Sequence, residues 1–236
     1  MTVAILTGGS GGLGLAVAHR LVEAGFSLGF CYHREENWAK EILTPHDRSY
    51  AASIDVRKPN TVSSAFKSFY DRLGSFDYVI TCHGITMDAR IEWMTEREWR
   101  AVLDVNLTGN FNVLQAALPF LNSPAHIAIV SSALQDRGVH GAANYAASKS
   151  GLLGLVRSAA SEFAERGVRV NLIAPGYFQA GMGARLSEKL RSRALTRIPL
   201  GRFGEPKEFA EFVLKVMETP YTTGQVFTVD GGVSWA

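Results

Sequence analysis

The stretch that decides the fold is VAILTGGSGGLGLAVAHRLVEAG, residues 3–25. A short apolar run stops at Thr7, five glycines lie between Gly8 and Gly14, and apolar residues then recur at helical spacing as far as Ala24. This order predicts a strand, a glycine turn and a helix. Glycine permits positive φ and lets the backbone approach a pyrophosphate, which then binds at the helix N-terminus. We therefore expect a nucleotide site here, or else a tight strand–helix turn that needs only small residues.

The spacing of these glycines can be read in two ways. The pattern that starts at Gly9 is Gly-x-Gly-x-x-Gly, the general dinucleotide fingerprint, whereas Thr7-Gly8-x-x-x-Gly12-x-Gly14 has a different spacing. No Gly-Lys-Ser/Thr sequence ends the turn, so a P-loop is excluded.

The rest of the chain alternates apolar strands with helical segments. Strands are expected at 26–32, in a run ending near 56, and at 78–81, 127–130, 168–173 and 225–229. Helices are expected after residue 33 and at 59–73, 96–121, 144–166 and 206–217. This alternation predicts one α/β domain over 1–236, a Rossmann-type doubly wound parallel sheet of about seven strands with helices on both faces. The segment 176–204 breaks the alternation and is expected to be a substrate lid or a pair of surface helices.

The composition excludes several classes of protein. The chain has 236 residues and a formal net charge of +2 without a run of like charges, so neither nucleic acid nor a membrane surface is an expected partner. No apolar run approaches the roughly 20 residues that cross a bilayer. Residues 1–6 enter a strand without a basic segment followed by an apolar signal core, so secretion is not expected. Cys31 and Cys82 lie in apolar runs, which favours a reduced, cytoplasmic protein. No metal site is predicted.

A second decisive stretch is Asn144-Tyr145-Ala-Ala-Ser-Lys149, with Ser132 thirteen residues before Tyr145. On a helix, Tyr145 and Lys149 lie on one face, one turn apart. An ammonium about 4 Å from the phenol would lower its pKa by roughly 3, toward the neutral range in which a general acid works best. Taken alone, such a pair is more often two surface neighbours, so the other motifs must decide between the readings.

Together these motifs resemble the short-chain dehydrogenase/reductase family over essentially the whole chain. The stretch 171–176 resembles the family's motif beside the nicotinamide, and 198–206 with 223–232 resembles its C-terminal signature. The resemblance implies four catalytic residues, Asn106, Ser132, Tyr145 and Lys149. It implies a nicotinamide-cofactor site made by Thr7, Gly8, Ser10, Gly12, Leu13, Gly14, His33, Arg34, Asp55, Val56, His83, Gly84, Tyr145, Lys149, Pro175, Gly176 and Phe178.

The cofactor is expected to be NADP(H). An NAD site usually presents an acidic side chain after the second strand, where it accepts a hydrogen bond from the ribose 2′-hydroxyl. Here His33 and Arg34 follow that strand, and an arginine can pair with a 2′-phosphate. Glu35 and Glu36 are assigned to the first turn of the next helix, whose dipole favours acids.

Within the family the closest resemblance is to 3-oxoacyl-[acyl-carrier-protein] reductases. It rests on Gly84-Ile-Thr-Met-Asp88, Trp99 and the stretches 104–109 and 198–206. Arg166 matches a basic position with which those enzymes hold the carrier. Those enzymes also commonly have a basic stretch before the fifth strand, and here Asn-Ser-Pro-Ala-His at 122–126 stands in its place.

Two further departures concern the cofactor site. Thr81-Cys82-His83 replaces the family's Asn-Asn-Ala, and Ala180 stands where a threonine is usual. His83 is interpreted as a packing variant rather than as a new catalytic group, because the four catalytic residues already supply the proton chemistry. The alanine at 180 removes one expected contact to the nicotinamide carboxamide.

The sequence therefore predicts an NADPH-dependent carbonyl reductase acting on a 3-oxoacyl thioester of acyl carrier protein or CoA. Tyr145 would donate the proton and Ser132 would stabilise the developing negative charge. The resemblance adds that Lys149 holds the nicotinamide ribose and Asn106 anchors a water. The alternatives are a reductase of a sugar, polyol or polyketide-type carbonyl, and a catalytically silent NADP(H)-binding regulatory protein.

Two expectations concern the surface. The resemblance implies a homotetramer or homodimer, with the helices at 96–121 and 144–166 as candidate interfaces. In the lid segment, four apolar residues are expected either to cover an acyl chain or to form the buried face of a helix: Phe178, Met182, Leu186 and Leu190.

Overall fold

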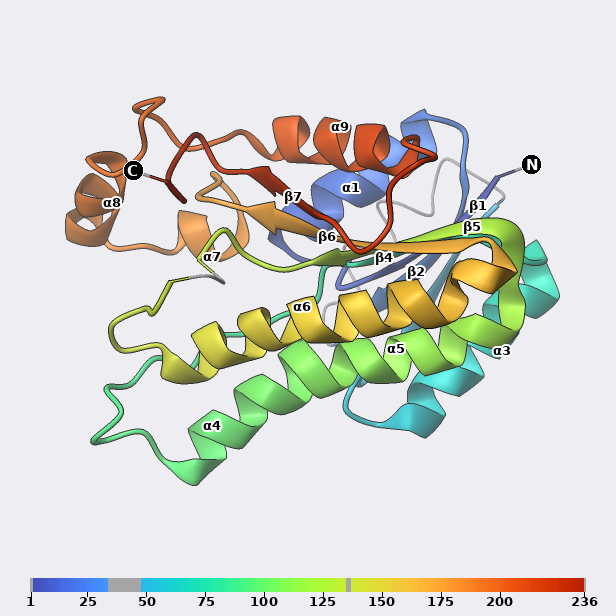
Figure 1. The fold of residues 1–236 in the computed structure, drawn as a ribbon, viewed down its shortest axis with the longest axis horizontal. Helices are drawn as coiled ribbons and strands as arrows, with labels where there is room; N and C mark the ends of the chain where they lie inside the picture. Colours follow the sequence, from blue (N-terminus) through green and yellow to red (C-terminus); the bar gives the residue numbers. More distant parts are fainter. Residues whose placement is uncertain (1, 34–47, 135–136, 236) are drawn as a thin grey trace.

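The computed structural model describes residues 2–33, 48–134 and 137–235, which fold around a seven-stranded parallel sheet (Figure 1). The strand order is β3-β2-β1-β4-β5-β6-β7. Because this order reverses beside β1, the carboxyl ends of β1 and β4 border the crevice in which open α/β sheets bind ligands. The strands are β1 Val3–Thr7, β2 Ser27–Tyr32, β3 Ser49–Ser53, β4 Phe76–Thr81, β5 Leu121–Val130, β6 Val168–Pro175 and β7 Val226–Val229.

Each strand divides its side chains between two cores. In β1, Ile5 belongs to the core beneath α3, α5 and α6, whereas Ala4 and Leu6 belong to the core beneath α1 and α9. Figure 1 shows the two helical layers on opposite sides of the sheet, which explains the continuous apolar runs of the strands. The helices are α1 Gly12–Glu23, α3 Pro59–Leu73, α4 Glu96–Leu103, α5 Gly109–Ala117, α6 Ala143–Phe163, α7 Gly181–Ala184, α8 Glu188–Leu195 and α9 Pro206–Met217.

The predicted doubly wound sheet is confirmed, and the differences lie at the ends of elements. The helix expected at 96–121 consists of α4, a π-helical turn at Asp104–Thr108, α5 and a 3-10 turn at Leu118–Phe120. Apolar spacing does not register the one extra residue of a π turn, so this interruption was not predicted. The helix expected after His33 falls within 34–47, outside the described residues. Among the described helices, none combines the length and the apolar character needed to cross a bilayer.

The lid segment, residues 176–204, contains α7 and α8 and has a small core of its own. That core consists of the buried residues Ala133, Ala194, Ile198, Phe203 and Val233. Phe178 instead belongs to the main core, where its ring centroid lies 5.5 Å from that of Phe209. Met182 and Leu190 are 46% and 49% exposed, so a single buried helix face that includes them is not formed.

Candidate active site

The turn between β1 and α1 packs so closely that a Cβ on any of four of its five glycines would lie under 3 Å from another atom. A Cβ on Gly8, whose φ is +70°, would lie 2.4 Å from the backbone nitrogen of His83, and a Cβ on Gly14 would lie 2.2 Å from the carbonyl oxygen of Gly8. A Cβ on Gly11 would meet nothing within 4 Å. A Cβ on Gly9 would lie 2.1 Å from the ring of Phe30. The close contacts thus include all three glycines of the spacing Thr7-Gly8-x-x-x-Gly12-x-Gly14, whereas the pattern from Gly9 includes Gly11, which has none.

The start of α1 offers backbone amides to an anion. Gly11 is the N-cap, no side chain caps the helix, and its first turn contains no acidic residue. The unpaired N–H groups and the helix dipole both favour a negative group at this position. The start of α7 closes on the turn, since a Cβ on Gly12 would lie 2.7 Å from the Cα of Gly181. Ala180, beside this contact, brings no hydroxyl to it.

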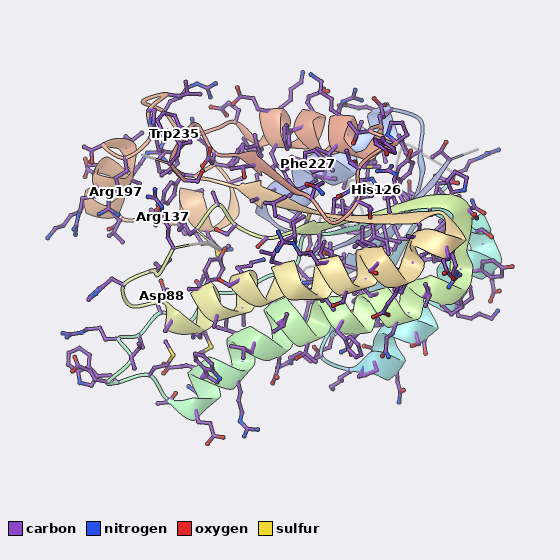
Figure 2. All side chains as sticks on the ribbon, viewed as in Figure 1. Asp88, His126, Arg137, Arg197, Phe227 and Trp235 are labelled. Atoms are coloured by element: carbon purple, nitrogen blue, oxygen red, sulfur yellow. The ribbon has the colours of Figure 1, made fainter. Side chains whose placement is uncertain are left out.

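Ser132 and Tyr145 meet between the end of β5 and the first turn of α6. Ser132 is 6% exposed, and its side chain forms a hydrogen bond with the Tyr145 phenol. Burial raises the pKa of Tyr145; the hydrogen bond from Ser132 opposes this rise, while Asp88 (labelled in Figure 2) and Tyr177 add to it. The phenol is consequently protonated at neutral pH and is available as a proton donor.

Lys149 lies one turn further along α6, with its ammonium bound to the sheet. Nζ donates to the carbonyl oxygen of Val130 at 2.9 Å and lies 5.9 Å from the ring centroid of Tyr145. Burial lowers the pKa of Lys149 to about 8, against a smaller opposing effect of Cys82. The predicted phenol pKa near neutrality is therefore wrong for this structure, because burial outweighs any stabilisation of the phenolate by Lys149 and raises the pKa of Tyr145.

Asn106 lies in the π turn and fixes the loop that follows β4. Its Oδ1 accepts from the amide of Ile85 at 2.8 Å, and its Nδ2 donates to the carbonyl of Ile85 and to Ser148 Oγ, both at 3.0 Å. Gly84 is held between Asn106 and Lys149, since a Cβ there would lie 3.4 Å from Asn106 Oδ1 and 3.5 Å from Lys149 Nζ. The side chain of Asn106 thus positions the backbone beside Lys149.

Several buried polar residues beneath this site were not predicted. Asn110 Nδ2 donates to the Asn106 carbonyl at 2.7 Å, and Asn110 Oδ1 accepts from Thr81 Oγ1 at 2.6 Å. Asn144 Nδ2 donates to the carbonyls of Met87 at 2.9 Å and Glu98 at 3.2 Å. The signal available in the sequence was the pair of asparagines four residues apart on an otherwise apolar helix face, because buried amides require partners.

His83 links the carboxyl ends of β1 and β4. It is 9% exposed, and its Nδ1 lies 2.7 Å from Thr7 Oγ1. Burial, and secondly the Lys149 cation, lower the pKa of His83 to about 3, so the ring is neutral. The backbone of Val105 lies near the ring and partly opposes this shift, yet Nε2 forms no well-oriented hydrogen bond with any described residue.

The adenine end of the predicted cofactor site is formed at β2 and after β3. His33 follows β2 and is exposed, whereas Arg34 lies outside the described residues. The carboxylate of Asp55 accepts two hydrogen bonds from the Arg57 guanidinium, at 2.8 and 2.7 Å, which lowers the pKa of Asp55 to about 2. Val56 is buried, and its carbonyl accepts from Asn112 Nδ2 at 2.8 Å.

The nicotinamide end follows β6, which ends at Pro175. Gly176 touches the C-terminal segment, because a Cβ there would lie 2.7 Å from the Cα of Asp230. The Phe178 side chain is 5% exposed in the main core, so only its backbone is available to a cofactor. Ser10 and Leu13 are partly buried in the glycine turn and at the start of α1.

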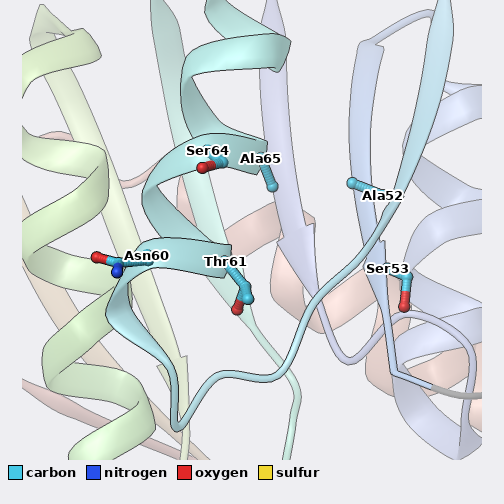
Figure 3. Close-up of a pocket in the computed structure, with 6 residues that line it drawn as sticks. All are labelled: Ala52, Ser53, Asn60, Thr61, Ser64 and Ala65. Carbon is cyan, nitrogen blue, oxygen red and sulfur yellow. The ribbon is translucent and has the colours of Figure 1, made fainter.

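A hollow of about 460 Å³ lies between β3 and α3 (Figure 3), and none of the four predicted catalytic residues lines it. Small neutral side chains line it: Ala52, Ser53, Asn60, Thr61, Ser64 and Ala65. With no acid, base or nucleophilic pair in its lining, it offers no catalytic chemistry of its own.

Known proteins resemble this chain along nearly its full length. The family model described as enoyl-(acyl carrier protein) reductase matches residues 8–234. The 3-oxoacyl-[acyl-carrier-protein] reductase of Staphylococcus aureus is 37% identical over 238 residues, covering 98% of this chain and 97% of its own. Carbonyl reductase family member 4 of Xenopus laevis is 36% identical over 233 residues, again covering 98% and 97%.

The architecture agrees with these relatives. A short-chain dehydrogenase/reductase from Serratia marcescens superposes with a TM-score of 0.93 at 26% identity, covering 99% of this chain and 98% of the other. The match includes the seven-stranded sheet, and the family model spans the glycine turn, Ser132, Tyr145 and Lys149. The chain therefore belongs to the short-chain dehydrogenase/reductase family of oxidoreductases.

Proposed function

We propose that this protein is an NADPH-dependent carbonyl reductase that converts a 3-oxoacyl thioester to the 3-hydroxyacyl product. The observation that carries the proposal is that Ser132 interacts with the partly buried, protonated phenol of Tyr145, with Lys149 one turn away. The names of the Staphylococcus aureus and Thermotoga maritima relatives, 37% and 35% identical, support the thioester substrate.

The described residues fit a dinucleotide cofactor. Gly8 and Gly14 let the turn fold closely against the backbone of His83 and of the turn itself, and the uncapped start of α1 that follows suits a pyrophosphate. His33, with Arg34 next in sequence, follows β2 and suits a 2′-phosphate better than a carboxylate would. When bound, NADPH supplies the hydride for the carbonyl carbon.

The protein's own residues handle the proton. Tyr145 is neutral before reaction and donates its proton to the carbonyl oxygen as negative charge develops there. Ser132 has a single O–H, which turns from the phenol to this oxygen and donates a hydrogen bond there. The Lys149 cation, about 6 Å from the ring, stabilises the phenolate left behind and can return a proton to it, because burial places its own pKa near 8.

The test compares wild type with Tyr145→Phe, using the absorbance of NADPH to follow a 3-oxoacyl thioester. The variant retains the ring and the fold but lacks the proton donor. We expect a loss of kcat of about 10²- to 10⁴-fold with unchanged NADPH binding, as is typical for removal of a general acid. Replacing NADPH by NADH in the wild-type reaction tests the preference for the 2′-phosphate.

A substrate panel separates this proposal from the others. Turnover of a 2-enoyl thioester in place of the 3-oxoacyl thioester would assign the reduction to a C=C bond, in line with the name of the matching family model. Turnover of sugars, polyols or polyketide-type ketones alone would replace the substrate class. Tight NADPH binding without turnover of any carbonyl would point to a regulatory binder.

Two further parts of the proposal concern the surface. The lid segment covers the substrate at the carboxyl edge of the sheet. The small core anchors the lid segment to this edge. A homotetramer or homodimer forms through the outer faces of α4, α5 and α6, where Trp99 is 38% and Phe111 45% exposed. Light scattering during size-exclusion chromatography, with Phe111→Lys as the disrupting variant, measures this assembly.

A further inference from the structure

The lid segment concentrates positive charge beside the site. Residues 176–204 contain six of the chain's 24 basic residues and one of its 22 acidic residues, Glu188. The rest of the chain is consequently slightly acidic, although the whole carries a net charge of +2. Such an asymmetry indicates an electrostatic function for this segment.

Four of these cations form a stripe, which we call the basic stripe: Arg185, Lys189, Arg193 and Arg197. They recur every four residues, so Lys189 and Arg193 share one face of α8 and the other two flank its ends. All four are exposed, and their charged groups form no ion pair or hydrogen bond with another described residue. By contrast, Arg202 pairs with Glu208 at 2.7 Å, and Arg191 stacks 4.4 Å above the ring centroid of Phe203.

The opposite face of α8 is anchored next to the catalytic loop. Ala194 and Ile198 are buried in the small core together with Ala133, which directly follows Ser132. The basic stripe therefore faces outward, whereas the inner side of α8 packs against the loop that contains Ser132 and Ala133. Figure 2 labels Arg197 beside α8, at the end of the molecule that also holds the start of α6. Leu190, 49% exposed, adds an apolar contact within the stripe.

We propose that the basic stripe is the docking surface for an acidic carrier protein that delivers the thioester substrate. This inference rests on the proposed function, since it names the carrier of that substrate. Charge complementarity supports it: unpaired cations around an exposed leucine fit an acidic, partly apolar helical surface. Docking there brings the carrier to the segment that covers the site, so that the attached acyl group reaches Tyr145.

Arg166, whose position matches a basic residue that holds the carrier in the related reductases, lies far from the proton donor within one chain. Arg166 lies 21 residues after Tyr145, about 30 Å away along α6 at roughly 1.5 Å per residue. Its guanidinium donates to the carbonyl oxygen of Leu118 at 2.8 Å. The stretch at 122–126, where carrier-protein reductases commonly have basic residues, contains none of lysine or arginine here. The basic stripe is the surface that takes their place.

The test measures binding of fluorescently labelled holo acyl carrier protein to the intact enzyme by anisotropy, at low and high salt. The stripe variant is Lys189→Gln with Arg193→Gln; the control, Arg48→Gln with Lys215→Gln, removes the same two charge types. Arg48 precedes β3 and Lys215 ends α9, so both control positions lie at the amino edge of the sheet, away from the lid segment. We expect the dissociation constant to rise about 3- to 10-fold in the stripe variant and not in the control.

Steady-state kinetics add a second readout. The KM for the carrier-bound thioester should rise in the stripe variant, with kcat and the KM for an uncharged N-acetylcysteamine thioester unchanged. High salt should weaken carrier binding to the wild type and remove the difference between the variants.

The outcomes separate this inference from the proposed function. Equal carrier binding by wild type and stripe variant, or equal weakening in the control, overturns the docking surface while the reductase activity stands. A matching rise in KM for a CoA thioester also overturns it, because the stripe would then recognise a small phosphate-bearing substrate. Salt-sensitive, stripe-dependent carrier binding without turnover of any thioester supports the surface and refutes the proposed activity.

Discussion

Gly14→Ala is the substitution that best tests the reasoning about the glycine turn, because two effects of opposite sign compete. Gly14 lies within α1, where alanine is favoured over glycine by about 1 kcal/mol. Against this, the new Cβ would lie 2.2 Å from the carbonyl oxygen of Gly8 and 3.1 Å from the Cα of Gly9. Both contacts are with backbone, so no side chain can rotate away.

The clash should outweigh the gain in helix propensity. Forcing a methyl group into a filled site costs about 1 to 3 kcal/mol and sometimes more, and a contact this short belongs at the upper end. A net destabilisation of about 2 kcal/mol corresponds to a fall in Tm of roughly 4 to 8 °C for a chain of this size. The displaced turn should also bind NADPH at least about tenfold more weakly.

Gly11→Ala is the matched control, three residues away in the same turn. Its Cβ would meet nothing within 4 Å, and its φ of −132° is open to any residue. Because Gly11 is the N-cap of α1, where alanine is less favourable than glycine, we expect a loss of at most about 1 kcal/mol. Thermal unfolding and NADPH fluorescence titration measure both variants. If Gly14→Ala melts at or above the wild-type temperature, or if Gly11→Ala is equally damaging, the assignment of the close contacts is wrong.

Three further predictions concern pH and capping. Burial lowers the pKa of His83 and of His126 to about 3, so below about pH 6.5 the unfolded chain binds more protons than the folded chain. In urea unfolding, the free energy of unfolding should therefore fall by about 1.4 kcal/mol for each pH unit of acidification and for each ring. His83→Ala should reduce that slope, and a flat profile from pH 6.5 to 5 would contradict the prediction. Lys149→Met should have a higher free energy of unfolding than wild type at pH 7, by at most about 3 kcal/mol, because burial disfavours the lysine cation and lowers its pKa to about 8. This difference should shrink toward pH 10, where Lys149 of the unfolded wild-type chain also loses its proton. Thr95→Ala should cost about 1 kcal/mol in urea unfolding, since it breaks the capping box with Glu98 at the start of α4, and an unchanged midpoint would show that the cap contributes nothing.

Much of the fold follows from patterns that are local in the sequence. Strands buried on both faces appear as continuous apolar runs, and the glycine turn marks the first strand–helix junction. The π turn at 104–108 escaped prediction because the apolar spacing continues through it. The early start of β5 escaped prediction because Asn122-Ser-Pro-Ala carries no apolar run.

The site could be predicted less completely, because its electrostatics depend on burial. Spacing correctly placed Tyr145 and Lys149 on one face of α6, but the sign of the phenol pKa shift depends on desolvation and on the distance of Nζ, neither of which a sequence contains. The lowered pKa of Asp55 could not be predicted for the same reason, because Arg57, two residues away, pairs with this carboxylate only when the backbone between them has the right geometry.

The separate core beneath α8 gives the molecule two cooperative units of different size. None of the five residues of this small core belongs to either of the two large clusters that flank the sheet. A unit with so little buried apolar area opens at a lower free energy than the whole protein. Amide hydrogens of α8 should therefore exchange with solvent far sooner than those of β1 or α6, and a ligand that seals this segment should slow their exchange while leaving the sheet unchanged.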